Sequence, residues 1–462
     1  MSDAGLQASE EKMRAAGVAP AAIAAFAHYY RRLEAGETGL LPESEIEPVD
    51  GVPDLEALPP PPAETADALL DRTVLIRLNG GLGTSMGMSR AKSLIEAHGG
   101  RTFLDLIVAQ VLSARARHSA RLPLLLMDSF STRDDTLAAL AAHHGLERDG
   151  LPLDFLQNRE PKLRADDLTP VRWPADPALE WCPPGHGDLY TALAASGTLA
   201  ALRERGYRYA FVANSDNLGA ALDTRLLAWF ADSGAPFAME VADRTEADRK
   251  GGHLARRRGG GLVLREAAQA PDADQDAFQD VARHRYFNTN NLWLDLDALA
   301  GALAAGGDVL ALPMIVNRKT ADPRDPDSPA VIQIETAMGA AISVFPGAEA
   351  IRVPRTRLIP VKTTNDLLAL RSDRYAVAQD GTVGPAPGCP SAPPVIDLDP
   401  AFFKLLDDFE ARFPGGPPSL AACERLTVRG DVEFGAHVAV RGATEVIHTG
   451  PGRLRISDGT VL

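Results

Sequence analysis

From residue 73 onward, short apolar runs alternate with longer stretches of helical pattern, and this alternation constrains the fold more than any other feature. Four of the runs are predicted to be buried strands, at residues 73–78, 122–127, 209–213 and 237–241. Strands that alternate with helices along a chain form a mostly parallel sheet covered by helices. The sequence therefore predicts an α/β fold for the body of the chain.

A helix is predicted at residues 21–35, before this body begins. Ile23, Phe26 and Tyr30 recur there at spacings of three and four, which is typical of the apolar face of a helix. Gly36 follows as a stop signal. The N-terminal segment is therefore expected to be helical.

The C-terminal end has a third pattern. Residues 381–394 are rich in Gly, Pro and Ala and predict a linker, followed by a short helical piece near residues 402–413. Beyond it, apolar residues recur every six positions in two series: Leu426, Val432 and Val438, then Val428, Phe434, Val440 and Val446. Such a period predicts about two coils of a parallel β-helix. An ordinary antiparallel meander is the alternative.

Charge and cysteine content exclude several classes of protein. A formal net charge of −15 disfavours binding to nucleic acid or to an anionic membrane, because phosphate polymers would be repelled. Three cysteines far apart suggest neither a disulfide framework nor a cysteine zinc site, so a reducing cytoplasm is expected. The acidic start and the lack of any run of about 18 apolar residues predict neither export nor a membrane span.

A glycine-rich turn, LNGGLGT at residues 78–84, follows the first predicted strand. Its glycines let backbone N–H groups approach a polyanion, and Lys92 can neutralise phosphates. The spacing does not fit a P-loop, because Ala91 precedes Lys92, and Met86 stands where a dinucleotide fingerprint requires glycine. A phosphate-binding loop of another kind is predicted, with a plain tight turn as the alternative.

The sequence NSDN at residues 214–217 follows another predicted strand. Open α/β sheets bind ligands at the carboxyl ends of their strands, and one acid beside phosphates is a common Mg²⁺ arrangement. Asp216 is therefore the candidate metal ligand. A helix cap is the alternative role for this aspartate.

Polar residues also occur at positions where folding of the chain does not require them. Residues 185–188 (GHGD), residues 288–291 (NTNN) and Glu335 combine amides, acids and a histidine, which suit sugar hydroxyls and the edge of a nucleobase. Turn chemistry is the alternative for each. Lys362 lies at a predicted strand-to-helix junction, where a solvated surface charge is the default interpretation.

Together these stretches resemble the eukaryotic-type UTP–glucose-1-phosphate uridylyltransferase family. The matching segments occur in the family's order between about residues 73 and 375: 78–87, 91–95, 183–193, 213–220, 250–254, 286–296, 331–342 and 359–368. The resemblance implies a nucleotidyltransferase sheet of GT-A or Rossmann-like type followed by a small β-helix domain. It also implies Mg²⁺-dependent conversion of UTP and glucose 1-phosphate into UDP-glucose and pyrophosphate.

The resemblance also assigns roles to individual residues. It implies that UTP is bound by Leu78, Asn79, Gly80, Gly81, Lys92, Gln157, Gly185, Asp216 and Lys362. It implies that the sugar phosphate is bound by His186, Asn214, Ser215, Lys250, Asn288, Asn290, Asn291 and Glu335. Lys92, Lys362 and Asp216 form the implied catalytic set, with Mg²⁺ on Asp216. Ala91 and Arg318 depart from the family, which has proline at both positions, and residues 321–329 are unusually rich in Pro and Asp.

Two alternatives remain beside this interpretation. One is a UDP-sugar or UDP-N-acetylhexosamine pyrophosphorylase, although the sequences of residues 288–293 (NTNNLW) and 335–342 (ETAMGAAI) favour glucose 1-phosphate. The other is a non-catalytic nucleotide-sugar-binding protein, against which the retained lysines and Asp216 argue.

The expected organisation is an N-terminal helical segment (1–72), a catalytic domain (73–380), a linker (381–400) and a β-helix domain (401–462). The last predicted coil of the β-helix has no further coil to cover its apolar edge. Self-association through the C-terminal domain is therefore a further expectation.

Overall fold

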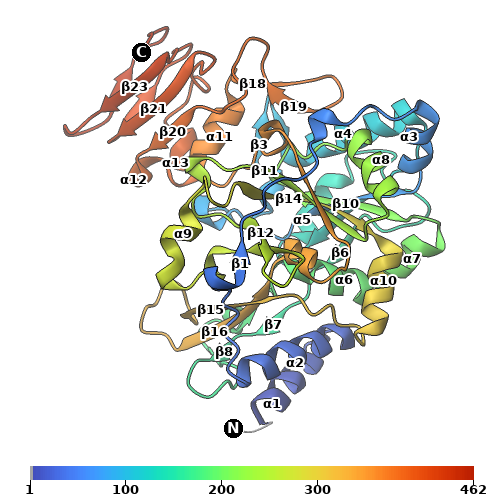
Figure 1. Cartoon of the computed structure of the whole chain (residues 1–462). Helices are drawn as coiled ribbons and strands as arrows, with labels where there is room; N and C mark the ends of the chain where they lie inside the picture. Colours follow the sequence, from blue (N-terminus) through green and yellow to red (C-terminus); the bar gives the residue numbers. More distant parts are fainter. Residues whose placement is uncertain (1–3) are drawn as a thin grey trace.

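A ten-stranded β-sheet forms the centre of the computed structural model, which describes residues 4–462 (Figure 1). Seven strands follow one another in the order β1-β12-β14-β10-β2-β5-β6, while β13 pairs with β12, β11 with β14, and β17 with β11. The strands are β1 (Ile46–Glu47), β2 (Thr73–Leu78), β5 (Leu124–Asp128), β6 (Asp154–Leu156), β10 (Tyr209–Asn214), β11 (Phe237–Asp243), β12 (His253–Arg257), β13 (Leu262–Arg265), β14 (Tyr286–Asp295) and β17 (Glu349–Arg352).

Both parallel and antiparallel pairs occur in this sheet. β10, β2, β5 and β6 run parallel, as do β11 and β17. β14 lies antiparallel to both β10 and β11. The predicted α/β fold is confirmed, but the sheet is mixed, not mostly parallel. β14 brings antiparallel pairs into the sheet. It was not predicted as a strand, because its polar residues 288–291 interrupt the apolar pattern.

Three of the four predicted strands begin at the expected residue. β2 matches its prediction at both ends, and β10 and β11 extend one and two residues further. β5 begins at Leu124, two residues later than predicted. Leu122 has φ +33°, a left-handed conformation that a strand cannot include.

Helices cover both faces of the sheet because alternate side chains of each strand point to opposite faces. On β2, Leu75 belongs to one apolar cluster, and Val74 and Ile76 belong to the other. The first cluster includes residues of α3 (Ala63–Leu70), α4 (Phe103–His118), α5 (Arg133–Leu140), α8 (Thr224–Ser233) and α11 (Thr364–Arg371). The second includes residues of α6 (Leu189–Ala195), α7 (Thr198–Glu204) and α10 (Leu296–Ala305).

The N-terminal segment begins with two helices, α1 (Ala4–Ala15) and α2 (Pro20–Glu34). The helix predicted at 21–35 is confirmed as α2, which begins with Pro20 in its first turn. Phe26 and Tyr30 of α2 pack against a small antiparallel sheet. That sheet contains β15 (Met314–Thr320), β16 (Ala330–Thr336) and β8 (Leu163–Arg164).

The C-terminal strands lie at one corner of the molecule (Figure 1). β21 (Cys423–Arg429) pairs with β20 (Val395–Leu398) and β23 (Gly442–Ile447), and β22 (Val432–Phe434) pairs with β24 (Leu454–Ile456). All of these pairings are parallel, which contradicts the antiparallel meander. The residues of both six-residue series are buried in the same cluster that covers the first face of the main sheet.

Residues 381–400, expected to be a linker, contain structure of their own. β19 (Val383–Pro385) pairs with β18 (Tyr375–Val377), and β20 joins the C-terminal strands. The parallel strands therefore begin before residue 401. The helical piece expected near 402–413 is two short helices, α12 (Pro400–Phe403) and α13 (Leu406–Glu410).

Short elements complete the fold: β3 (Glu96–His98) with β4 (Arg101–Thr102), β7 (Glu160–Pro161) with β9 (Trp181–Cys182), and helix α9 (Gln275–Gln279). Across residues 4–462, no helix combines the length and apolar character needed to cross a bilayer.

Candidate functional site

The glycine-rich loop leaves the carboxyl end of β2 and is fixed there by Asn79. Its side-chain amide donates to Asp128 Oδ1 (2.8 Å) and to Thr136 Oγ1 (2.9 Å). Asp128 is completely buried, and burial raises the pKa of its carboxyl to about 6. The side chain of Asn79 therefore anchors the loop to β5 and α5, and its backbone N–H donates to the Met127 carbonyl at 2.8 Å. The N–H groups of Gly80 and Gly81 remain for a ligand.

The resemblance implies that Gln157 and Gly185 hold the uracil and that the Gly80 backbone contacts UTP, and these three residues lie together. A Cβ atom at Gly80 would lie only 2.8 Å from Gln157 Oε1. Gln157 Nε2 in turn donates to the carbonyl of Gly185 at 3.2 Å. Gly185 has φ +81°, and a Cβ there would meet the Thr336 carbonyl at 2.5 Å, so only glycine fits. The structure thus gathers Gly80, Gln157 and Gly185 around one spot.

Lys92 and Asp216 form an ion pair across the loop. Lys92 Nζ lies 2.7 Å from Asp216 Oδ2, and the backbone N–H of Lys92 donates to the Gly81 carbonyl at 3.1 Å. Both side chains are partly exposed, at 16% and 21%, so a ligand can reach them. The helix-cap alternative for Asp216 is wrong, because Asp223 caps α8.

The segment that carries Lys362 lies directly against the Asp216 turn. The N–H of Val361 donates to the Asp216 carbonyl at 3.2 Å. Thr363 then caps α11 in a reciprocal arrangement with Asp366, which confirms the predicted helix start. The backbones next to Lys362 and Asp216 are therefore in contact.

His186 has a defined tautomer. Its Nδ1 accepts a hydrogen bond from the N–H of Met338 at 3.0 Å, so the ring proton of the neutral imidazole sits on Nε2. Desolvation lowers the pKa of His186 to about 4. At neutral pH His186 is therefore an uncharged hydrogen-bond donor.

The asparagines of β14 differ in what they offer. Asn288 Nδ2 donates to Asn290 Oδ1 at 3.0 Å, and Asn290 has φ +58°. Asn291 is fully buried and donates to Glu240 Oε2 at 3.0 Å, so it lies beneath the site surface.

The remaining predicted residues lie on three different segments of the chain. Asn214 pairs in register with Leu78, and the Ser215 N–H donates to the Leu78 carbonyl at 3.0 Å. Lys250 is exposed in the turn before β12. Glu335 lies 3.7 Å from Lys319 Nζ.

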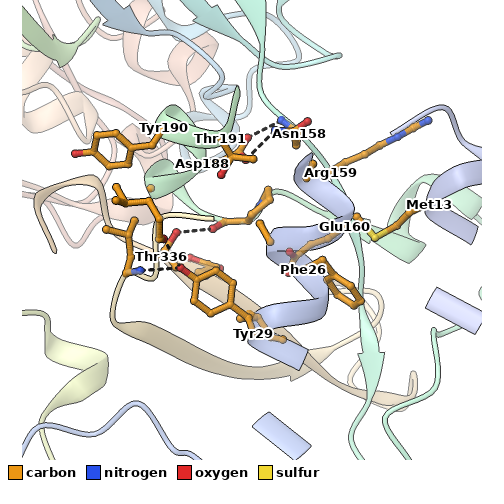
Figure 2. A pocket seen from close by; sticks show the side chains of 18 residues that line it. Met13, Phe26, Tyr29, Asn158, Arg159, Glu160, Asp188, Tyr190, Thr191 and Thr336 are labelled. Atoms are coloured by element: carbon orange, nitrogen blue, oxygen red, sulfur yellow. Dashed lines mark hydrogen bonds between the residues drawn. The ribbon is translucent and has the colours of Figure 1, made fainter. Parts of the chain in front are cut away.

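A pocket beside the turn that contains Gly185 is lined in part by residues of the two N-terminal helices, as Figure 2 shows. Tyr29 of α2 lines it together with Glu160, Asp188 and Glu335. Burial, reinforced by Asp188 and Glu335, raises the pKa of Glu160 well above its usual value. Asp188 accepts hydrogen bonds from Asn158 N (2.6 Å) and Nδ2 (2.9 Å), and burial raises its pKa to about 6.

One acidic group near Lys362 was not predicted from the sequence. Glu266, at the end of β13, interacts electrostatically with Lys362, and burial raises the pKa of its carboxyl. A Cβ at Gly252 would lie 2.5 Å from Glu266 Oε2, so the turn after Lys250 packs against this acid. Nothing in the sequence distinguishes Glu266 from an ordinary surface acid after a hairpin.

The C-terminal segment also contacts the site. Gly87, in the glycine-rich loop, has φ +78°, and a Cβ there would lie 3.0 Å from Leu405 Cδ2. Thr364, two residues after Lys362, donates to the Phe403 carbonyl at 2.6 Å. The motifs of the predicted site all lie before residue 370. The structure shows that Phe403 and Leu405, beyond that point, pack against the segments that carry Lys362 and Gly87.

A stacked pair of histidines lies under the predicted Lys250 turn. The rings of His253 and His284 are 3.9 Å apart between centroids, and both side chains are fully buried. Burial lowers the pKa of both imidazoles, and in His284 a hydrogen bond to Glu43 (3.0 Å) opposes the shift. Both rings are therefore neutral in the folded protein at neutral pH.

This pair predicts acid sensitivity of the fold. In the unfolded chain a histidine takes up its proton near pH 6.5, whereas the folded chain resists protonation there. The unfolded state thus binds more protons below about pH 6.5, and stability falls as the pH decreases through that region. We expect His253→Phe to reduce the drop in thermal unfolding midpoint between about pH 7.5 and pH 5.5. His144 is exposed, so His144→Phe serves as control, and an equal effect of both variants would contradict the prediction.

Among the described residues, no three histidine, cysteine or acidic side chains are grouped to hold a metal ion by themselves. Mg²⁺, however, is commonly held by one or two carboxylates together with substrate phosphates and water. The single carboxylate of Asp216, beside a loop suited to phosphates, fits that chemistry.

Comparison with known proteins agrees with this geometry. A family model described as UTP–glucose-1-phosphate uridylyltransferase matches residues 23–441. The Solanum tuberosum protein of that name is 42% identical over 404 residues, 87% of this chain and 82% of that protein. The Saccharomyces cerevisiae protein is 39% identical over 394 residues, 85% of this chain and 77% of that protein.

Solved structures extend the similarity to the full fold. A Leishmania major UDP-glucose pyrophosphorylase variant in complex with UDP-glucose has a TM-score of 0.94 and 44% identity, covering 100% of this chain and 98% of that one. The Trypanosoma brucei UDP-glucose phosphorylase has a TM-score of 0.91 and 45% identity, covering 99% and 98%. Because the family model matches most of this chain, the chain belongs to the UTP–glucose-1-phosphate uridylyltransferase family, whose members are nucleotidyltransferases.

Proposed function

We propose that the chain joins glucose 1-phosphate to the UMP part of UTP, giving UDP-glucose and pyrophosphate. The observation that carries this proposal is the meeting of the glycine-rich loop, Lys92, Asp216 and the Lys362 segment at the carboxyl ends of β2 and β10. A phosphate oxygen of glucose 1-phosphate attacks the α-phosphorus of UTP, and the bond to the pyrophosphate oxygen breaks. The attacking phosphate is already an anion, so no general base is required.

The residues of the chain then have distinct tasks in this proposal. Gly80, Gln157 and Gly185 hold the uracil, supported by their mutual contacts. Lys92 and Lys362 stabilise negative charge on the phosphates as the bond to pyrophosphate breaks. Mg²⁺ bound by Asp216 supplies additional neutralisation of phosphate charge.

The sugar phosphate is proposed to lie between His186 and the asparagines of β14. The Nε2–H of neutral His186 offers a hydrogen bond without adding charge. Asn214, Ser215, Lys250, Asn288, Asn290, Asn291 and Glu335 remain the proposed sugar-phosphate set, with Asn291 acting from below.

The ion pair between Lys92 and Asp216 joins two groups that have separate tasks in this proposal. Arriving UTP offers phosphate oxygens to Lys92, and Lys92 can then leave the Asp216 carboxylate. Asp216 would then be free to hold Mg²⁺, which is commonly bound by one or two carboxylates together with substrate phosphates.

Pyrophosphate release from purified protein with UTP, Mg²⁺ and a panel of sugar 1-phosphates tests the proposal. Glucose 1-phosphate with UTP is expected to give the highest kcat/KM. Equal turnover of galactose 1-phosphate or N-acetylglucosamine 1-phosphate would instead support a pyrophosphorylase of broader specificity. Binding of UDP-glucose without any turnover would support a non-catalytic protein.

We also propose that the C-terminal domain is a small parallel β-helix. Its strands pair only in parallel, and Ala439 forms parallel bridges to both Ser419 and Val461. We keep the predicted units 1–72 and 73–380, with the last domain starting at β20. A cytoplasmic location remains part of the proposal, supported by three free cysteines.

Self-association through this domain is a related proposal. Ile447 and Val461 are large apolar side chains of this domain, and they are exposed at 58% and 59%. We expect light scattering to give a mass above that of one chain, and Ile447→Lys with Val461→Lys to reduce it to the monomer. The exposed pair Arg441→Ala and Glu445→Ala is the matched control. A monomeric unmodified protein would remove the proposal.

A further inference from the structure

Asn217, the residue next to the candidate metal ligand, uses every hydrogen-bonding position of its side chain. Its amide nitrogen donates to the Arg357 carbonyl (3.1 Å) and to Asn291 Oδ1 (3.2 Å). Its oxygen accepts from the N–H groups of Ile359 (2.8 Å) and Gly219 (3.2 Å). The residue is 2% exposed, so water does not compete for these bonds.

Two of these partners belong to the segment that leads into Lys362. The Arg357 carbonyl and the Ile359 N–H precede Lys362 by five and three residues. The backbone of Asn217 also forms an antiparallel bridge with Pro360. The side chain of one residue therefore ties the Asp216 turn to the Lys362 segment.

Below Asn217 lies a buried network that is anchored on β11. The Arg357 guanidinium donates to both oxygens of Glu240, at 2.7 and 2.8 Å, and Asn291 Nδ2 donates to Glu240 at 3.0 Å. Trp293 Nε1 donates to the same carboxylate at 3.0 Å. Glu240 is fully buried, so its charge depends on these partners, and removing one of them is costly.

We propose that Asn217 is a positioning residue that fixes the distance between the Asp216 carboxylate and the Lys362 ammonium. This inference rests on the proposed function, in which both groups act on the same phosphates. An error of about 1 Å in such an arrangement can cost on the order of 10²-fold in rate. No other neutral side chain of this size supplies two donors and two acceptors in a fixed plane.

The test compares Asn217→Ala and Asn217→Asp with Trp293→Phe. The alanine variant loses all four side-chain bonds. The aspartate variant keeps its shape and the two accepted bonds, and it is the one to use if the alanine variant does not fold. Trp293→Phe removes a hydrogen bond to Glu240 from the same network without touching either loop, so it is the matched control.

We expect both Asn217 variants to lower kcat by on the order of 10²-fold, with KM for glucose 1-phosphate changed by less than about threefold. Amide hydrogen exchange of residues 359–363 should become faster in Asn217→Ala. Trp293→Phe should lower the thermal unfolding midpoint while kcat and this exchange stay unchanged.

A kcat within about threefold of the parent protein in both Asn217 variants would overturn the inference. An equal loss of kcat in Trp293→Phe would also overturn it, because the effect would then be a general loss of core stability. A parent protein that releases no pyrophosphate would defeat the proposed function, and the exchange of residues 359–363 would still test the positioning.

Discussion

Replacing Asp216 by asparagine is expected to remove most of the activity and leave the fold intact. The amide keeps the shape of the side chain but loses the charge that holds Mg²⁺ beside the phosphates. A loss on the order of 10³-fold in kcat is expected, comparable to removing one oriented charge-stabilising group. The measurement is turnover across a series of Mg²⁺ concentrations, with the thermal unfolding midpoint recorded in parallel.

Loss of the ion pair with Lys92 is a second possible cause of reduced activity in Asp216→Asn, beside loss of Mg²⁺ binding. Asp216→Asn also removes the partner of Lys92, although a partly exposed pair contributes only about 0 to 1 kcal/mol to stability. If Asp216 acts only by orienting Lys92, Asp216→Asn should respond to Mg²⁺ with the same half-saturating concentration as the parent protein. Near-normal turnover at saturating Mg²⁺ would contradict the metal assignment altogether.

The elements that could be predicted from the sequence are those whose local pattern decides their structure. The centre of β2, residues 74–76, is apolar and buried, and the predicted bounds of the strand are the observed ones. β14 was missed because it carries four polar residues, whose burial depends on partners such as Glu240 that lie on another strand. A single sequence does not show such a pairing.

The same limit applies to the candidate site. Asp216 directly follows a predicted strand, and Lys92 follows the glycine-rich turn after another, so the pattern placed these two at one edge of the sheet. Gln157 was implied by the resemblance alone, because β6, which precedes it, was not predicted as a strand. Asn217 lay in the same motif, but its role depends on backbone groups of residues 357–359, about 140 positions away. The contact between Leu405 and Gly87 was not predicted either, because these two residues are also far apart in the sequence.

Lys362→Ala is expected to lower kcat far more than it raises KM. Charge on the phosphates grows towards the transition state, whereas binding of UTP is shared with the uracil contacts and Lys92. Removing one cation from the departing pyrophosphate should lower kcat by on the order of 10²-fold. Steady-state kinetics with both substrates varied give the two constants separately.

Two further variants show whether the effect belongs to the position of this charge. Lys362→Arg keeps a cation but replaces a compact ammonium with a planar guanidinium, so it should recover only part of kcat. Arg441→Ala removes an exposed cation from the C-terminal strands and should leave kcat unchanged, which excludes a general effect of net charge. If Lys362→Ala changes only KM for UTP, Lys362 binds substrate without assisting the reaction. The N–H of Val361 donates to the Asp216 carbonyl, so the backbones next to Lys362 and Asp216 are in contact. A change in KM alone would show that this contact does not by itself bring the Lys362 ammonium to the breaking bond.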